Sequence, residues 1–267
     1  MNLSRIRYET EGGLAWITLN RPEKLNSIDA AMVAELNQAL DTAEADEQVR
    51  VIVLRGEGRA FSAGFDLEDS CEPDDEQGLR EELSRDFGII MRFWDSPKVT
   101  LSMIHGHCLG SAMEMALACD ITIAADDCRL GAPEVKFGSG IVALIMPWLC
   151  GPKKAKEWLL TGNDRITAQD ARNWGLVNSV VPASELGAAA RDMATAIALN
   201  DPVAVRLTKQ AINRSNEIAG MKKALHEALE ADIEVELTET DESREFNRIL
   251  RTQGARAAIA WRRTHIG

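Results

Sequence analysis

The feature that most constrains the fold is the run from Val99 to Ala125, in which Glu114 and Asp120 are the only charged residues. A stretch this apolar is typical of buried core. The run nevertheless contains GHCLGSAMEM at 106–115, where small residues that fill space poorly precede Glu114. A carboxylate at this position is expected to have little contact with water, because its neighbours are apolar. It predicts either a first-turn glutamate that complements a helix dipole or a buried functional acid.

Strand and helix signals alternate up to about residue 180, and helix signals alone follow. Alternating or continuous short apolar runs predict strands, and apolar residues three or four positions apart predict helices. The predicted strands are 14–20, 51–56, 99–104, 121–125, 129–134 and 178–181, and the predicted helices are 30–46, 79–94, 111–119, 144–150, 153–161, 168–174, 185–200, 203–216, 221–237 and 242–252. An acidic, mobile loop is expected at 68–78. This order predicts an α/β core with an all-α tail.

Composition restricts the function. The chain of 267 residues has a formal net charge of -12, which argues against nucleic acid as its main partner. The five cysteines have no metal-ligand spacing and predict reduced thiols, so no metal site is expected. The first residues contain no apolar signal core, and no apolar run is long enough to span a membrane. We therefore expect a cytoplasmic protein without a membrane partner.

Two glycine-containing loops offer free backbone amides. Gly110 follows a predicted strand and precedes a helix that Ser111 would begin, and amides at a helix start carry partial positive charge. The second loop, GRAFSAGFDL at 58–67, has small residues that leave its backbone accessible, although an ordinary connection from strand to helix would look the same. One amide from each loop would bind a developing enolate oxygen.

A second carboxylate lies in GAPEV at 131–135. Pro133 favours an extended Ala132, and Glu134 follows at the predicted strand end, where site residues lie in open α/β sheets. Taken alone, a glutamate in this context is more often a surface carboxylate. Two amide-rich loops and two carboxylates together predict a site that activates a carbonyl and moves protons.

These segments resemble a known family. NRPEKLNS at 20–27, AFSAGFDL at 60–67 and the stretch from 104 to 135 resemble, in order and spacing, the motifs of the crotonase superfamily, or enoyl-CoA hydratase/isomerase family. A weaker resemblance continues over 159–182. It implies an α/β fold, a spiral of β-β-α units, at 1–200, and a C-terminal all-α trimerisation region at 201–267 that builds homotrimers, commonly paired into homohexamers.

The resemblance also implies an acyl-CoA thioester substrate. Its carbonyl would be held by the N–H groups of Phe65 and Ser111, while Glu114 activates water and Glu134 protonates the α-carbon. No cofactor is implied, because amides rather than an ion hold the enolate. Further CoA and substrate contacts are implied at Lys24, Leu25, Arg59, Ala60, Ala63, Gly64, Asp66, Leu67 and Gly110. Lys24 and Arg59 are equally consistent with ordinary surface charge.

Both glutamates favour an enoyl-CoA hydratase, which adds water to a 2-enoyl-CoA and gives a 3-hydroxyacyl-CoA. The alternatives are a Δ3-Δ2 enoyl-CoA isomerase or another crotonase-type reaction, and a non-catalytic acyl-CoA-binding protein. The chain departs from the family pattern at Ser111 and Ala112, where glycines are common, at Glu68, where a lysine is common, and in the loop 138–148. The acyl group stays open.

Overall fold

The computed structural model describes residues 3–67, 76–238 and 240–264. Its main sheet has six strands in the order β1-β2-β3-β4-β6-β9. Only β1 is antiparallel to its neighbour; the remaining pairs are parallel. The strands are β1 (Ile6–Glu11), β2 (Leu14–Leu19), β3 (Val51–Gly56), β4 (Val99–Ile104), β6 (Ile121–Ala125) and β9 (Ser179–Val181). A second sheet holds β5 (His107–Leu109), β7 (Arg129–Gly131) and β8 (Ile166–Thr167).

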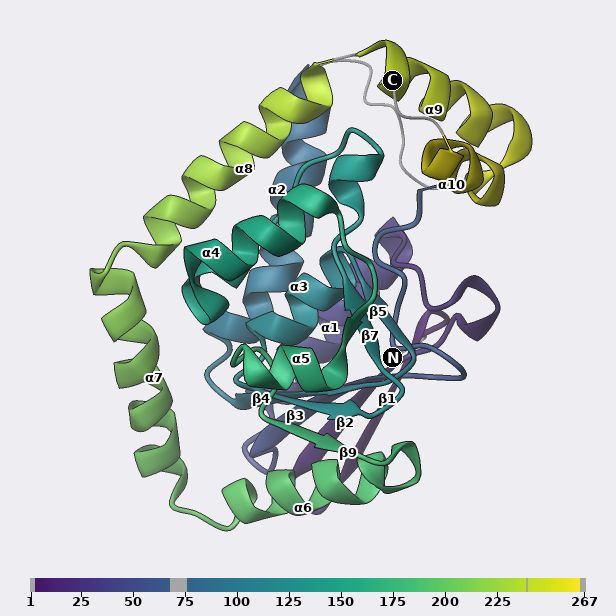
Figure 1. Cartoon of the computed structure of the whole chain (residues 1–267). Helices are drawn as coiled ribbons and strands as arrows, with labels where there is room; N and C mark the ends of the chain where they lie inside the picture. The colour runs from purple at the N-terminus through teal and green to yellow at the C-terminus, as the bar shows by residue number, and fades with distance from the viewer. Residues whose placement is uncertain (1–2, 68–75, 239, 265–267) are drawn as a thin grey trace.

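Helices cover both faces of the main sheet and then extend away from it (Figure 1). The α-helices are α1 (Ala30–Ala45), α2 (Glu76–Asp95), α3 (Ser111–Ala118), α4 (Met146–Thr161), α5 (Ala168–Asn173), α6 (Leu186–Ala198), α7 (Pro202–Ile218), α8 (Met221–Leu237), α9 (Asp241–Gln253) and α10 (Ala255–Thr264). Three short 3-10 helices are η1 (Pro22–Lys24), η2 (Glu134–Lys136) and η3 (Ala183–Glu185). This architecture confirms the predicted α/β core with C-terminal helices.

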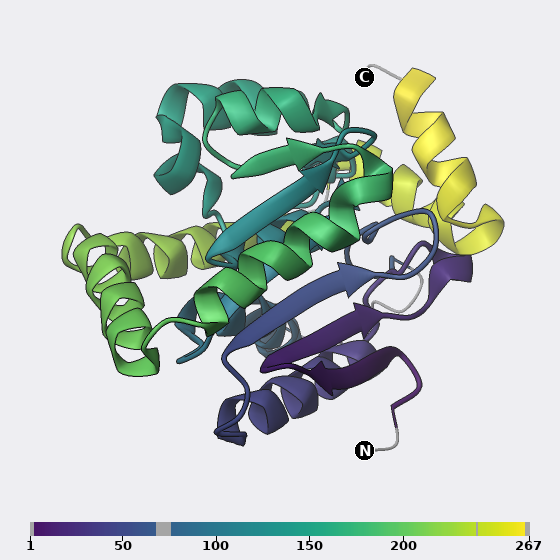
Figure 2. The ribbon, with the colours of Figure 1, turned by 90° about the horizontal axis from the view of Figure 1, so that it is seen from below.

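The two faces of the sheet belong to two separate cores. Along β2, Ile17 and Leu19 pack in the large core with α1, whereas Leu14 and Trp16 pack on the opposite face with α6. Figure 2 shows α6 lying over one face of the main sheet, where it contacts β2, β3, β4 and β6. Because successive side chains of a strand point to opposite faces, a strand covered on both sides is apolar throughout. This explains why the run that begins at Val99 holds so few charges.

The structure corrects several predicted element boundaries. The predicted strand 129–134 ends at Gly131, and Glu134 begins η2 instead. The helices predicted at 144–150 and 153–161 form the single α4, with a kink at Gly151, where φ is 77° and ψ is 160°. Helix α2 begins at Glu76, so the predicted loop 68–78 was wrong at its end. The rest of that loop, 68–75, including Glu68, lies outside the described residues.

The sequence analysis missed the strands β1, β5 and β8, the helix α10 and the three short 3-10 helices. Strand β1 is an edge strand with mostly exposed or half-buried side chains, so its apolar alternation is weak. Strand β5 has only three residues between two glycines, and α10 follows Gly254, which ends α9. In the part of the chain that the structure describes, no helix is long and apolar enough to cross a membrane.

Helices α7 and α8 extend from the core as an outer arm, which Figure 1 shows in light green. The buried Lys209 of α7 anchors this arm, because its Nζ lies 2.7 Å from Asp120 Oδ2 and donates to the Lys98 carbonyl at 2.9 Å. Helix α8 then returns along α2. The predicted boundary at residue 200 falls between α6 and α7, and the oligomerisation role of 201–267 stays a prediction.

Candidate active site

The two predicted amide-rich loops meet at Gly64 and Gly110. Pairing between Ser62 and Cys108 holds them side by side, since Leu109 N–H donates to the Ser62 carbonyl at 3.1 Å. A Cβ atom on Gly64 would lie 3.0 Å from Leu109 O and 3.5 Å from the nitrogen of Ser111. A side chain at position 64 would therefore crowd the second loop. Glycine also permits the positive φ of 95° there.

Two backbone donors are left free where the loops meet. Within residues 3–67, 76–238 and 240–264, neither the Phe65 N–H nor the Ser111 N–H donates a hydrogen bond. Ser111 is the first residue of α3, so its N–H is one of the groups that a helix start leaves unpaired. Gly110, the N-cap, has φ 57° and ψ −140°. The predicted pair of oxyanion donors is thus brought together, and both donors are available.

Glu114 is fully buried in the first turn of α3. Its Oε2 accepts a hydrogen bond of 2.7 Å from the Ala143 N–H, whereas Oε1 is buried and has no partner among the described residues. Burial, with the nearby Glu134 charge as a second cause, raises the pKa of Glu114 well above its usual value. Glu114 does lie in the first turn of α3, as predicted. Because its side chain is fully buried, it is not a solvent-exposed glutamate that only complements the helix dipole.

Glu134 approaches the same place from η2. A Cβ atom on Gly110 would lie 2.7 Å from Glu134 Oε1, so the missing side chain at 110 makes room for this carboxyl. Glu134 Oε2 is buried and also lacks a partner in the described part of the chain. Burial raises the pKa of Glu134 to about 8. Glu134 is therefore not the plain surface carboxylate that its sequence context allowed.

Asp232 is a third buried carboxyl that the sequence analysis missed. It lies on α8, 3% exposed, and burial raises its pKa to about 7. Its charge contributes to the raised pKa values of both Glu114 and Glu134, so it belongs to the same cluster. The signal was present in the sequence, because an aspartate three residues after Leu229 lies on the apolar face of a helix.

The predicted CoA-binding residues lie in two adjoining segments. The Ala63 N–H donates to the Leu25 carbonyl at 3.0 Å, which brings 20–27 against 58–67. Lys24 and Arg59 are exposed there, and Ala60 is buried. Asp66 pairs with Arg21 at 3.0 Å and accepts from Ser27, so it fixes the loop. Leu67, half-buried, precedes the undescribed residues.

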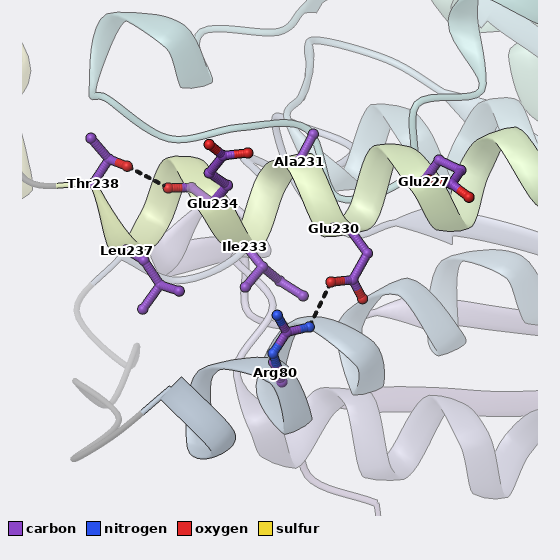
Figure 3. A pocket seen from close by; sticks show the side chains of 8 residues that line it. All are labelled: Arg80, Glu227, Glu230, Ala231, Ile233, Glu234, Leu237 and Thr238. Carbon is purple, nitrogen blue, oxygen red and sulfur yellow. Dashed lines mark hydrogen bonds and ion pairs between the residues drawn. The ribbon is translucent and has the colours of Figure 1, made fainter.

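Other features lie apart from this cluster. Across the described ranges, no group of three or more His, Cys, Asp or Glu side chains is arranged to hold a metal ion. A surface groove between α2 and α8, crossed by an ion pair of 2.6 Å between Arg80 and Glu230, contains none of the three carboxyls (Figure 3). Its lining residues are Arg80, Glu227, Glu230, Ala231, Ile233, Glu234, Leu237 and Thr238.

Paired free amides beside buried carboxyls are typical of enzymes that stabilise an enolate oxygen and move protons. The enoyl-CoA hydratase/isomerase family matches residues 9–250, and the chain therefore belongs to this family. It is a crotonase-type enzyme of a family that acts on acyl-CoA thioesters.

Named relatives and solved structures agree with this assignment. A short-chain-enoyl-CoA hydratase of Clostridium acetobutylicum is 36% identical over 80% of this chain and 83% of its own length. The crystal structure of an enoyl-CoA hydratase/isomerase from Xanthobacter autotrophicus Py2 is 46% identical, covers 100% of both chains and superposes with a TM-score of 0.97. An enoyl-CoA hydratase from Mycobacterium smegmatis is 29% identical, covers 98% of this chain and 94% of its own, and has a TM-score of 0.90.

The raised carboxyl pKa values predict a stability that falls as pH rises. A carboxyl with a pKa of about 8 when folded, but near 4 when unfolded, holds its proton longer in the folded chain. Stability is therefore lost between these values. We expect Glu134→Gln to raise the thermal unfolding midpoint by about 5–15 °C more at pH 8 than at pH 5. Calorimetry at both pH values measures this, with exposed Glu227→Gln as control; equal shifts at both would contradict it.

Proposed function

We propose that this protein is an enoyl-CoA hydratase, which adds water syn across a 2-enoyl-CoA thioester and gives a 3-hydroxyacyl-CoA. The observation that carries the proposal is that unpaired backbone donors and unpaired carboxyl oxygens lie in the same site. The N–H groups of Phe65 and Ser111 are unpaired within the described ranges, and beside them Glu114 and Glu134 each have a buried oxygen without a described partner.

The thioester carbonyl accepts hydrogen bonds from the Phe65 and Ser111 N–H groups. As a nucleophile attacks the β-carbon, negative charge moves onto this oxygen, and preorganised donors stabilise that charge more than the neutral carbonyl. The Ser111 N–H carries the additional positive potential of the α3 N-terminus. In this proposal the two N–H groups stabilise the negative charge of the enolate, so the reaction requires neither a metal nor an organic cofactor.

The two carboxyls divide the proton transfers. Their charges repel, so burial allows the pair to ionise one at a time. The Ala143 N–H donates to Glu114 and favours its ionised form, as the backbone N–H of Glu134 does for Glu134, although burial raises the pKa of both groups. We assign Glu114 as the base that takes a proton from water, which is the role that the family resemblance implies for it. Glu134, with a pKa of about 8, holds a proton at neutral pH and delivers it to the α-carbon.

The exposed Lys24 and Arg59 lie on the adjoining segments 20–27 and 58–67. We assign them to the phosphates of CoA, because a chain with a net charge of -12 needs local cations to hold a polyanion. Leu25, Ala60, Ala63 and the neighbouring loop residues then contact the rest of the ligand. A non-catalytic acyl-CoA-binding protein would not need two buried, unpartnered acids.

Replacing either glutamate separates a hydratase from an isomerase. Hydration needs one group to deprotonate water and another to protonate carbon, so Glu114→Gln and Glu134→Gln should each lower kcat by roughly 10²–10⁴. The assay follows loss of the conjugated-thioester absorbance of crotonyl-CoA, and circular dichroism checks folding. In an isomerase, which can shuttle one proton with one base, Glu114→Gln would spare most turnover. Full hydratase activity of Glu114→Gln would exclude it as the base.

The oxyanion donor is tested by a substitution that keeps the helix. Proline is well tolerated at the first position of a helix, where it removes an N–H that the helix does not use. Ser111→Pro should lower kcat on the order of 10²–10³, whereas Ser111→Ala, which retains the N–H, should change it little. Steady-state kinetics on both variants measures the difference. Equal rates in the two variants would rule out this N–H as a donor.

The exposed apolar side chains of α7 support a homotrimer or homohexamer. Val203, Leu207, Ile212 and Ile218 are each at least half exposed, so α7 presents several large apolar side chains on the outer arm that nothing in the described part of this chain covers. We expect sedimentation at micromolar concentration to give the mass of three or six chains. Leu207→Glu combined with Ile212→Glu should lower that mass. A stable monomer of the unchanged protein would contradict the proposal.

A further inference from the structure

Asp232 has no part in the reaction proposed above, yet its carboxyl is buried without a partner. It is 3% exposed, and neither oxygen makes a hydrogen bond within residues 3–67, 76–238 and 240–264. The Gly140 N–H is close enough to offset part of the effect of burial on the Asp232 pKa, but it does not reach hydrogen-bond geometry. An unsatisfied buried polar group costs about 1–3 kcal/mol. A ligand group that satisfies it regains that energy on binding.

One segment, 134–143, connects all three carboxyls. It begins at Glu134, a Cβ atom on Gly140 would overlap the Asp232 carboxyl, and Ala143 donates to Glu114. The oxyanion donors lie at the Glu134 side of this segment, because the Glu134 carboxyl rests against Gly110. The acyl chain of a thioester held there would extend along this segment, and the close approach of Gly140 places the Asp232 carboxyl against the same segment.

We propose that Asp232 determines substrate specificity by accepting a hydrogen bond from a hydroxyl group on the acyl chain, so that the preferred substrates are hydroxylated acyl-CoA thioesters. This inference rests on the proposed function, because it uses the thioester position assigned above. A site whose buried acceptor needs a substrate hydroxyl rejects the analogue that lacks it, since the acceptor is then left unpaired. A hydrocarbon acyl chain would leave both Asp232 oxygens without a hydrogen-bond partner.

The surrounding charges favour a neutral donor over an anion. After burial, the charge that acts most on the Asp232 pKa is that of Glu236, and Glu236 in turn feels Glu82. Burial raises the pKa of Glu114, Glu134 and Asp232 alike, so this end of the site disfavours an ionised carboxylate. An acyl chain that ends in a carboxylate would be disfavoured. A hydroxyl carries no charge and both donates and accepts, which suits a carboxyl with a pKa of about 7.

The test compares saturated thioesters, which bind but cannot be hydrated. Calorimetry measures the Kd of butanoyl-, pentanoyl- and hexanoyl-CoA, of their ω-hydroxy derivatives and of pentanedioyl-CoA. At the chain length that reaches Asp232, the hydroxylated member should bind about 10–100-fold more tightly than its parent. Pentanedioyl-CoA should bind most weakly. Equal affinity of parent and hydroxylated thioester at every length, or tightest binding of pentanedioyl-CoA, would overturn the proposal.

Variants assign the preference to Asp232. Asp232→Leu should reduce the ratio of the two Kd values to about 1. The matched control is Glu234→Leu, on the same helix, where Figure 3 shows Glu234 pointing away from Arg80; it should keep the ratio of the unchanged protein. Asp232→Asn retains the shape and a neutral acceptor, so it should lower the ratio by about tenfold even if Asp232→Leu fails to fold. An unchanged ratio in a folded Asp232 variant would overturn the proposal.

Hydration of the corresponding 2-enoyl thioesters distinguishes this inference from the proposed function. If the hydroxylated thioesters bind preferentially but no 2-enoyl-CoA is hydrated, the acyl specificity holds and the reaction is a different one. If all 2-enoyl-CoA thioesters are hydrated with equal kcat/KM, the proposed function holds and the role of Asp232 is wrong.

Discussion

The contact between two backbone loops at Gly64 and Gly110 is the constraint on which the site depends. A Cβ atom on Gly64 would crowd Leu109 O, and one on Gly110 would displace the Glu134 carboxyl. Positive φ angles at both positions add a second reason for glycine. The pairing of Ser62 with Cys108 fixes the distance between the loops. The oxyanion donors therefore come from parts of the backbone that cannot move apart without breaking sheet-like pairing.

Sequence patterns were informative where one element decides the outcome. The apolar run that begins at Val99 gave β4, α3 and β6 close to their observed bounds, because a strand or helix buried on all sides has a strong signal. The family motifs predicted the N–H groups of Phe65 and Ser111 as donors, and among the described residues both are unpaired; their catalytic role stays a prediction. Burial of Glu114 also followed from its apolar neighbours.

Asp232 shows where sequence reasoning stopped. Its place beside Glu134 depends on the return of α8 along α2, and on a glycine at 140 in a loop far away in the sequence. The spacing of Asp232 after Leu229 marks the apolar face of the helix, but no local pattern identifies which elements pack against that face. The short β5 and the polar β1 were missed for a related reason, because their pairing partners rather than their own periodicity hold them in the sheet.

The three buried carboxyls compromise stability for the sake of function. Each is desolvated, and among the described residues Glu114 receives one hydrogen bond from Ala143 while Asp232 receives none of normal geometry. In the free protein, burial disfavours the charged form of each carboxyl, so each group holds its proton to a higher pH and its pKa is raised. In the proposed reaction, a water held between Glu114 and Glu134 and a hydroxyl at Asp232 would supply the hydrogen bonds that the protein does not provide. On this proposal, the acids are left unsatisfied in the fold so that only a ligand of matching polarity satisfies them.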